Sequence, residues 1–238
     1  MALIKQNVTQ FDSDVEENEG YKYTTNAKYS SVVANKRIME EMYKTIPSTT
    51  KSLIDIGCGD GTYTNEIKQK YPHIEVTGID PSIKGIAIAK KKYSNITFSD
   101  INIYDAEKIA EKKYDLSIFS GVLHHMSDQF LAIKNAKLFS DEMLIIEPNG
   151  NNFILKWIEK NSQYHIEHEE QSFSTKLLSQ WCVDNGWEIK SVNYIGFVPF
   201  FFPTLLSKII YFFQPILEKL PIIRKYLSAQ IVIYCKKK

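Results

Sequence analysis

The sequence has few cysteines, almost no net charge and no secretory signal, and each absence excludes a class of protein. Cys58, Cys182 and Cys235 are the three cysteines of 238 residues, and they form no CxxC pair. Neither a disulfide framework nor a zinc site is therefore expected, and a reducing cytoplasm is the expected setting. With 29 basic and 28 acidic residues, the chain lacks the positive field that draws proteins onto nucleic acid, so we predict no nucleic-acid partner.

The amino terminus also lacks the layout of a signal peptide, because residues 1–20 hold one lysine, a cluster of acids and no long apolar run. We therefore expect the mature protein to begin here. The stretch 194–213 is apolar enough to suggest a transmembrane helix, but Pro199, Pro203 and Lys208 interrupt it. A chain of this length can bury a sizeable core, as one large domain or one domain with an appendage.

Short β-branched runs alternate with helical patterns over residues 51–147, which is typical of a parallel sheet flanked by helices. Apolar residues at helical spacing over 31–44 predict a helix before this core. The last two expected strands are separated by an insert of about thirty residues, which is too long for a hairpin connection. The strands are expected at 51–56, 74–80, 95–103, 114–120, 141–147, 187–195 and 230–235.

The first expected strand runs into the loop GCGDG at 57–61 and then into a helix. Glycines at such a turn let a ligand approach the backbone closely. The dinucleotide fingerprint GxGxxG needs a glycine where this chain has Thr62, so a dinucleotide is disfavoured. Asp55 before the loop and Asp60 within it would repel a phosphate, but they suit a ligand with an amino group or a sulfonium.

Asp80 closes the second expected strand, 19 residues after Gly61. A carboxylate at this position can accept hydrogen bonds from both hydroxyls of a ribose. Such charge-assisted bonds contribute roughly 1.5 to 3 kcal/mol each. The loop and Asp80 together indicate a nucleoside-containing ligand without a diphosphate.

Three ordered motifs follow one another at 53–61 (LIDIGCGDG), 78–82 (GIDPS) and 114–125 (YDL, then SGVLHH). Together they resemble the class I S-adenosylmethionine-dependent methyltransferases, over about residues 30–150. The resemblance implies an α/β fold, a Rossmann-like three-layer sandwich with a seven-stranded, mostly parallel sheet and an antiparallel last strand. It divides the chain into an N-terminal helical cap segment at 1–50 and a methyltransferase domain at 51–238, with an apolar helical insert at about 198–228.

The resemblance also implies S-adenosyl-L-methionine as the cofactor, with Asp55 ordering the loop and the methionine amino group. Gly57 and Gly59 would let the cofactor lie against the backbone, and Asp80 would hold its ribose. We interpret Cys58 as a small buried residue of the loop rather than a nucleophile.

The remaining cofactor contacts implied by the resemblance follow the second, third and fourth strands. Pro81 comes directly after the ribose-binding acid. Asn102 and Ile103 stand where the family usually has an acid and a residue packed on the adenine ring, and Asp100 is the competing assignment. Ser120 and Gly121 would lie beside the methionine portion, and these four positions and Pro81 complete the expected cofactor set.

His124 and His125 stand where the fourth strand ends, near the expected methyl group. One of them can serve as a general base because imidazole titrates near neutrality, and His125 is the preferred candidate. The alternative is that the pair only shapes the pocket. Methyl transfer can rely on alignment, since proximity contributes roughly 7 to 11 kcal/mol in favourable cases.

Four residues are candidates for contact with the acceptor substrate. Glu147 and Asn149 follow the fifth strand at the edge where open parallel sheets bind ligands, although a turn without ligand contact is equally consistent with them. His165 lies among carboxylates, and without a third spaced ligand beside His168 we predict no metal. Tyr29 is a candidate from its place in the segment that often covers the cofactor in this superfamily.

The insert is unusually aromatic, with eight of the 30 aromatic residues inside 194–213. We consider a wall for an apolar acceptor first, an internally packed mini-domain second and peripheral membrane contact third. The predicted function is methyl transfer to an oxygen or nitrogen of a small, apolar or lipid-like acceptor. A non-catalytic S-adenosylmethionine-binding sensor or partner subunit is the alternative, and the sequence specifies no oligomeric state.

Overall fold

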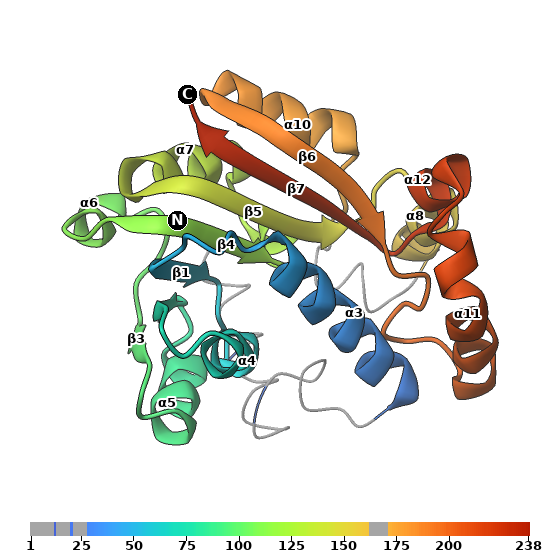
Figure 1. Cartoon of the computed structure of the whole chain (residues 1–238), viewed down its shortest axis with the longest axis horizontal. Coiled ribbons are helices and arrows are strands. Elements are labelled where there is room, and N and C mark those ends of the chain that lie inside the picture. The colour runs from blue at the N-terminus through green and yellow to red at the C-terminus, as the bar shows by residue number, and fades with distance from the viewer. Residues whose placement is uncertain (1–11, 13–19, 21–27, 162–170) are drawn as a thin grey trace.

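The computed structural model describes residues 12, 20, 28–161 and 171–238. Its strands form one seven-stranded sheet in the order β3-β2-β1-β4-β5-β7-β6 (Figure 1). The strands are β1 (Ser52–Ile56), β2 (Glu75–Ile79), β3 (Thr97–Ser99), β4 (Tyr114–Ser120), β5 (Ser140–Pro148), β6 (Trp187–Ile195) and β7 (Gln230–Lys237).

The strand directions place the ends of several strands at one edge of the sheet. Strands β1 to β5 pair in parallel, whereas β7 is antiparallel to both β5 and β6. Gln230 pairs with Pro148 on one side and with Ile195 on the other. The carboxyl ends of β1, β4, β5 and β6 therefore share an edge, and the predicted seven-stranded, mostly parallel fold with an antiparallel last strand is confirmed.

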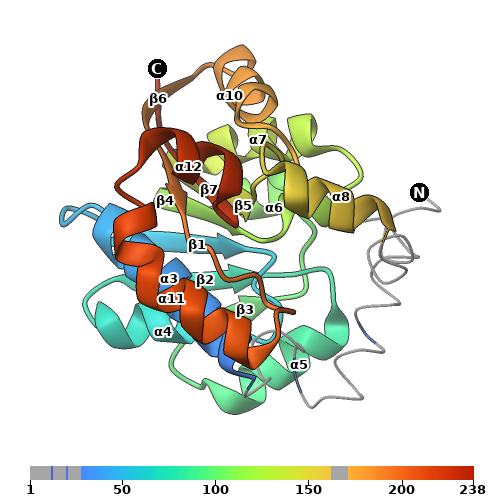
Figure 2. The same ribbon diagram turned by 90° about the vertical axis from the view of Figure 1, so that its right-hand side faces the viewer.

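Helices cover both faces of this sheet. Figures 1 and 2 show α7 and α10 on one face and α3, α4 and α5 on the other. The helices are α3 (Tyr29–Thr45), α4 (Thr62–Lys70), α5 (Ile83–Lys92), α6 (Ala106–Ala110), α7 (Gln129–Phe139), α8 (Phe153–Asn161), α10 (Thr175–Asp184), α11 (Thr204–Leu217) and α12 (Pro221–Leu227), with a 3₁₀ turn, η1 (Leu123–His125).

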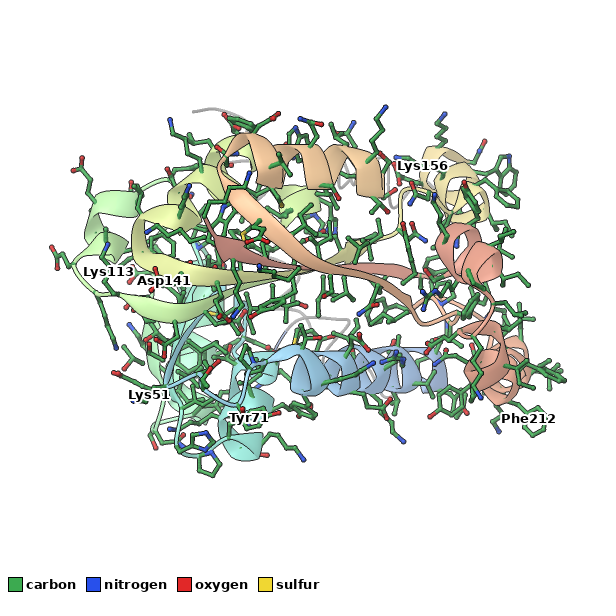
Figure 3. All side chains as sticks on the ribbon, turned by 45° about the horizontal axis from the view of Figure 1, so that its top comes forward. Lys51, Tyr71, Lys113, Asp141, Lys156 and Phe212 are labelled. Carbon is green, nitrogen blue, oxygen red and sulfur yellow. The ribbon has the colours of Figure 1, made fainter. Side chains whose placement is uncertain are left out.

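Central strands contribute side chains to two cores, one on each face of the sheet. In β5, Met143 and Ile145 pack in the cluster that includes α7 and α10, whereas Leu144 and Ile146 pack in the cluster that includes α3 and α4. Side chains fill the space between the sheet and these helices (Figure 3). Such a strand is apolar along its length because both of its faces are buried, and each fully buried side chain contributes roughly 1.5 to 3 kcal/mol.

The third strand is shorter than the sequence pattern predicts, and our expectation of 95–103 was wrong at both ends. Only Thr97–Ser99 is strand. Asn102 begins a turn instead: its side-chain Oδ1 accepts a hydrogen bond from the backbone N–H of Tyr104, and its carbonyl accepts one from the N–H of Asp105. Asparagine favours such local bonds over a strand ladder.

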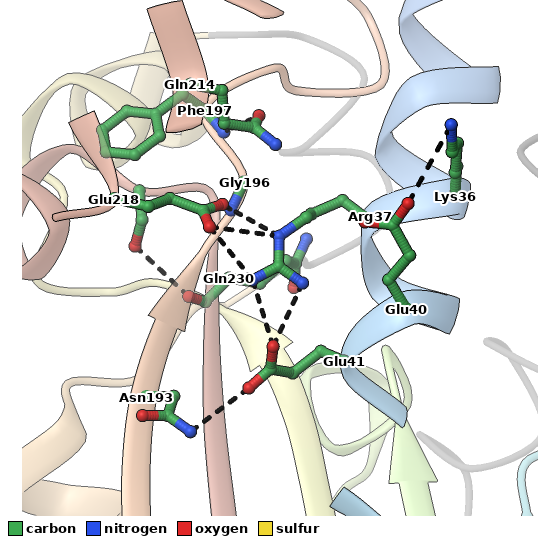
Figure 4. A network of polar contacts seen from close by, with 11 residues as sticks. Lys36, Arg37, Glu40, Glu41, Asn193, Gly196, Phe197, Gln214, Glu218 and Gln230 are labelled. Carbon is green, nitrogen blue, oxygen red and sulfur yellow. Dashed lines mark hydrogen bonds and ion pairs between the residues drawn. The ribbon is translucent and has the colours of Figure 1, made fainter. Parts of the chain in front are cut away.

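A polar network joins the first helix of the core to the insert (Figure 4). Arg37 of α3 donates from Nε to Glu218 Oε1 at 2.9 Å and from Nη2 to Glu41 Oε2 at 3.0 Å. Asn193 donates to the other oxygen of Glu41, and the N–H of Gly196 donates to Glu218. Burial alone would lower the pKa of Arg37, but the two carboxylates outweigh it and raise that pKa.

We expect Arg37→Met to destabilise the protein by about 3 kcal/mol, because it leaves the buried Glu41 carboxylate without its cation. Lys36→Met is the matched control, since its pair with Glu40 is exposed and such pairs contribute about 0 to 1 kcal/mol. Urea unfolding followed by circular dichroism measures both. Equal losses in the two variants would contradict the role given to Arg37.

Candidate active site

The loop between β1 and α4 has a backbone that favours glycine. Gly57, Gly59 and Gly61 have φ of 75°, 55° and 76°, in the left-handed region that other residues rarely adopt. The N–H groups of Gly57 and Cys58 both donate to the carbonyl of Ile79 at the end of β2, at 2.8 and 3.1 Å. These bonds fix the loop beside the end of the neighbouring strand.

Asp80 holds the loop from the end of β2. Its Oδ2 accepts a hydrogen bond from the N–H of Gly59 at 2.9 Å, and its Oδ1 accepts one from the N–H of Ser82 at 2.8 Å. A carboxylate oxygen has two lone pairs, so both oxygens retain capacity for a further donor. The structure therefore brings the predicted ribose acid and the predicted glycine loop together.

Asp55 lies at the end of β1, buried beneath the loop. Its Oδ2 accepts a hydrogen bond from Thr64 Oγ1 of α4 at 2.6 Å. Burial raises the pKa of Asp55 to about 6 against the opposing effect of Thr64, and burial likewise raises the pKa of Asp80 to about 6 against its backbone hydrogen bonds. Two buried carboxylates this close to one loop suit a ligand that brings positive charge and hydroxyl donors.

Cys58 and Pro81 flank these acids. The Cys58 side chain is buried, and burial, followed by the negative charge of Asp80, raises the pKa of its thiol. A thiol with a raised pKa is a poor nucleophile, which agrees with its interpretation as a packing residue. Pro81 is half-buried between Asp80 and Ser82, and Ser82 caps α5 by accepting from the N–H of Gly85.

The predicted adenine residues follow β3 on the same side of the sheet. Asn102 is half-buried in its turn, and Ile103 is buried with its carbonyl accepting from Asn135 Nδ2 at 3.1 Å. Asp100, the competing candidate, is exposed. The half-buried amide of Asn102 therefore lies closer to the core than the Asp100 carboxylate.

The end of β4 carries the two histidines. Ser120 is half-buried and Gly121, with φ of 62°, is exposed at the edge. A side chain at Gly121 would meet only His124, whose Cε1 would lie 3.9 Å from the added Cβ. The rings of His124 and His125 lie with centroids 3.8 Å apart. Residues predicted for the methionine portion and for catalysis thus share one short turn.

Glu147 of β5 holds this turn through hydrogen bonds to its backbone and to His124. It is fully buried, and its Oε1 accepts hydrogen bonds from the N–H groups of Val122 and Leu123, both at 2.8 Å. Its Oε2 lies 2.7 Å from Nδ1 of His124. Because the carboxylate accepts, Nδ1 of His124 donates, and in the neutral ring Nε2 is then the nitrogen with the lone pair. Glu147 is therefore more deeply buried than His124, whose side chain lies closer to the surface at the carboxyl edge of the sheet.

The other predicted acceptor residues lie in different surroundings. Asn149 is buried, and its Nδ2 donates to the carbonyls of Lys225 and Ser228, which ties the residue after β5 to α12 and to the turn before β7. Tyr29 packs edge-on against Tyr211 of α11. His165 lies outside the described residues.

Sequence reasoning missed two contacts at this site. Asp12 accepts a hydrogen bond from Ser82 Oγ at 2.5 Å, so one residue of the amino-terminal segment reaches the second motif. The pairing of Glu147 with His124 also joins β5 to the turn that follows β4. A fully apolar strand that ends in an acid, LIIE at 144–147, was the available signal, since a buried carboxylate requires partners.

Within the described part of the chain, no group of three histidine, cysteine or acidic side chains is arranged to hold a metal ion. No helix among those residues is long and apolar enough to cross a membrane. The apolar stretch that suggested a span contains the end of β6, a turn and the first part of α11.

Methyltransferases are among the known proteins that match this chain. A protein-family model described as a methyltransferase domain matches residues 47–193. The malonyl-[acyl-carrier protein] O-methyltransferase of Paenibacillus sp. is 24% identical over 147 residues, which are 56% of this chain and 53% of that protein. The chain therefore spans about half the length of this curated relative.

Solved structures share the fold. A Thermotoga maritima structure, described as an S-adenosylmethionine-dependent methyltransferase and possible histamine N-methyltransferase, superposes with a TM-score of 0.63 at 18% identity, over 86% of this chain and 89% of that one. Magnesium protoporphyrin IX methyltransferase from Synechocystis, with S-adenosylmethionine bound, gives 0.55 at 14% identity, over 90% and 86%. Because the family model spans more than half of the chain, the protein belongs to the class I S-adenosylmethionine-dependent methyltransferases.

Proposed function

We propose that this protein transfers a methyl group from S-adenosylmethionine to an oxygen or nitrogen of a small, apolar or lipid-like acceptor at the carboxyl edge of its sheet. The observation that carries the proposal is the alignment of three features at that edge. Asp80 and the loop 57–61 lie at the ends of β1 and β2, and the His124–Glu147 pair lies at the end of β4.

The donors and acceptors at the first two features fit the cofactor. Asp80 would accept from the ribose hydroxyls, and Asp55 with the loop would receive the methionine amino group. Asn102 and Ile103 would contact the adenine, with Ser120 and Gly121 beside the methionine portion. When bound, the cofactor supplies a methyl group activated by a positively charged sulfur. The raised pKa values of Asp55 and Asp80 support the fit, because a cationic ligand would favour their charged forms.

His124 is the stronger candidate for the general base. Glu147 fixes the orientation of its ring through Nδ1, and in the neutral ring Nε2 is the nitrogen that would take the proton that the acceptor loses. The sequence favours His125, and the contact of His124 with Glu147 moves the assignment to its neighbour. Glu147 is then a positioning residue that acts through His124.

The names of two similar proteins and the apolar side chains near the site support the proposed class of acceptor. The Paenibacillus relative is named as an O-methyltransferase and the Thermotoga maritima structure as a possible N-methyltransferase, so oxygen and nitrogen both stand as acceptor atoms. Exposed apolar side chains of α8, α11 and α12 follow the ends of β5 and β6, and these favour an apolar acceptor over a highly charged one.

Calorimetric titration with S-adenosylmethionine tests the cofactor site. The wild type should bind, and Asp80→Ala should raise Kd at least tenfold, because each lost charge-assisted hydrogen bond is worth roughly 1.5 to 3 kcal/mol. Asp100→Ala is the matched control and should bind as the wild type does. An unchanged Kd in Asp80→Ala would reject the ribose assignment.

Affinity should also depend on pH. With pKa values of about 6 for Asp55 and Asp80, both are largely charged at pH 7.5 and largely protonated at pH 5. Since the ligand requires the charged forms, Kd should rise at least about tenfold over that range. Asp55→Asn should flatten the dependence. A Kd that stays constant from pH 7.5 to pH 5 would contradict the electrostatic account.

Transfer of tritium from methyl-labelled S-adenosylmethionine into a metabolite and lipid extract tests the reaction. His124→Gln should slow transfer by about 10²- to 10⁴-fold with an unchanged cofactor Kd, and His125→Gln should slow it less. A rate unaffected by His124→Gln would remove the proposed base. Cofactor binding without transfer to any component would favour the non-catalytic sensor.

A further inference from the structure

Helix α11 is amphipathic in the reverse sense from an ordinary surface helix. The buried positions of α11 are Ser207, with 0% of its surface exposed, and Gln214. Gln214 Oε1 accepts from the N–H of Phe197, and Ser207 Oγ donates to the carbonyl of Pro203. Phe212 lies on the outer face with 76% exposed, and it points away from the body of the protein (Figure 3). A helix in water normally buries its apolar side chains and exposes its polar ones.

Neighbouring helices extend this apolar face. Helix α12 packs against α8, and Figures 1 and 2 show α8, α11 and α12 along the same side of the molecule. We call the exposed large apolar side chains of these helices, and of the turns beside them, the apolar surface. Its members are Phe153, Ile154, Trp157, Phe201, Leu205, Leu206, Ile209, Phe212, Phe213, Ile216, Leu220, Ile222 and Tyr226.

The number of exposed side chains in the apolar surface indicates that a partner covers it. Thirteen of the twenty exposed large apolar side chains in the described residues belong to it. Single exposed apolar side chains are ordinary, whereas a gathering of this kind marks an interaction site or an aggregation hazard. The side chains of the insert are therefore not explained by an internally packed mini-domain alone.

The charges around the apolar surface identify the kind of partner. Residues 196–228 contain the basic residues Lys208, Lys219, Arg224 and Lys225 and the single acid Glu218, which is paired with Arg37. The chain as a whole is close to neutral, with 29 basic and 28 acidic residues, so this positive excess is local. Apolar side chains bordered by cations are complementary to a bilayer that carries anionic headgroups.

The same charges disfavour a second copy of this chain as the partner. In a symmetric dimer the same patch of both subunits meets, which would bring two positively charged borders together. An anionic bilayer meets the same border with opposite charge.

The helices are too short to insert across a membrane. Helix α11 has 14 residues, about 21 Å at 1.5 Å per residue, whereas a hydrocarbon core is about 30 Å thick. Its strongly exposed apolar side chains also lie on one face. A helix with these properties lies in the plane of the interface, with its apolar face in the headgroup boundary.

We propose that the apolar surface docks this protein on anionic bilayers, with α11 lying parallel to the membrane plane. The insert leaves the sheet after Ile195 and returns at Gln230, which pairs with Pro148 at the end of β5. The docking surface therefore adjoins the edge that carries His124. Docking itself does not require methyl transfer and is tested without it.

Co-sedimentation with vesicles provides the test. The wild type should pellet with phosphatidylcholine vesicles containing 30 mol% phosphatidylglycerol, and should pellet less with pure phosphatidylcholine. Raising the salt to about 0.5 M should weaken binding to the anionic vesicles, since exposed charges are then screened within a few ångströms.

Matched variants separate docking from general surface hydrophobicity. Phe212→Ser/Ile216→Ser should weaken vesicle binding at least tenfold. The control is Leu138→Ser/Val183→Ser, which removes two exposed apolar side chains of α7 and α10, 50% and 44% exposed, from outside the apolar surface. It should bind as the wild type does. Thermal unfolding by circular dichroism verifies that both variants are folded.

Trp157 supplies a second readout, because it is 67% exposed on α8, whereas Trp181 is half-buried and Trp187 is buried. Its fluorescence should shift to shorter wavelength on addition of anionic vesicles, and the shift should be absent in Trp157→Phe.

Three outcomes would overturn the proposal. The first is failure of the wild type to pellet with anionic vesicles, and the second is equal pelleting of the wild type and Phe212→Ser/Ile216→Ser. The third is a concentration-dependent dimer in sedimentation velocity that this variant abolishes, because that result would assign the apolar surface to a second copy of the chain. Cofactor calorimetry on the same variant keeps the two proposals separate, because failure of docking leaves its Kd for S-adenosylmethionine unchanged.

Discussion

The arrangement of the candidate site depends on one fully buried carboxylate, that of Glu147. It accepts from two successive backbone N–H groups after β4 and contacts Nδ1 of His124, so one side chain of β5 fixes both the path of the turn and the orientation of a ring. This turn also restricts which residue can stand at position 57, since a Cβ added at Gly57 would lie 2.2 Å from Cγ2 of Val122. Burial of this charge is tolerated because its hydrogen bonds replace those with water.

Asp55 and Asp80 show the opposite balance, because burial makes their charged forms unfavourable for the stability of the folded chain. Their pKa values in the folded chain are about 6, above the ordinary 3.8, so the folded state holds protons that the unfolded state releases. Their contribution to the free energy of unfolding is therefore greatest at low pH and falls as the pH rises from about 4 to about 6. Above pH 6 the unliganded protein carries two charged, buried acids, and a ligand with complementary donors compensates for them.

Local patterns predicted most of the fold, and long-range pairing explains what they missed. The strand at 187–195, the glycine loop and Asp80 could be read from the chain, because periodicity and turn chemistry act over a few residues. The Glu147–His124 contact joins residues 23 apart and no short motif encodes it. The apolar insert was recognisable, but its exposure was not: composition cannot tell whether Phe212 or Gln214 faces inward, and the inward position of Gln214 depends on its bond with Phe197 of another segment.

The central claim is that the acids and the glycine loop at the carboxyl edge form the S-adenosylmethionine site. A crystal structure with S-adenosylhomocysteine tests it most directly. The account predicts ribose hydroxyls within hydrogen-bond distance of the Asp80 carboxylate and the amino acid portion along residues 57–61, beneath the turn that carries His124. A ligand bound elsewhere, or bound at this edge without contact to Asp80, would contradict the account.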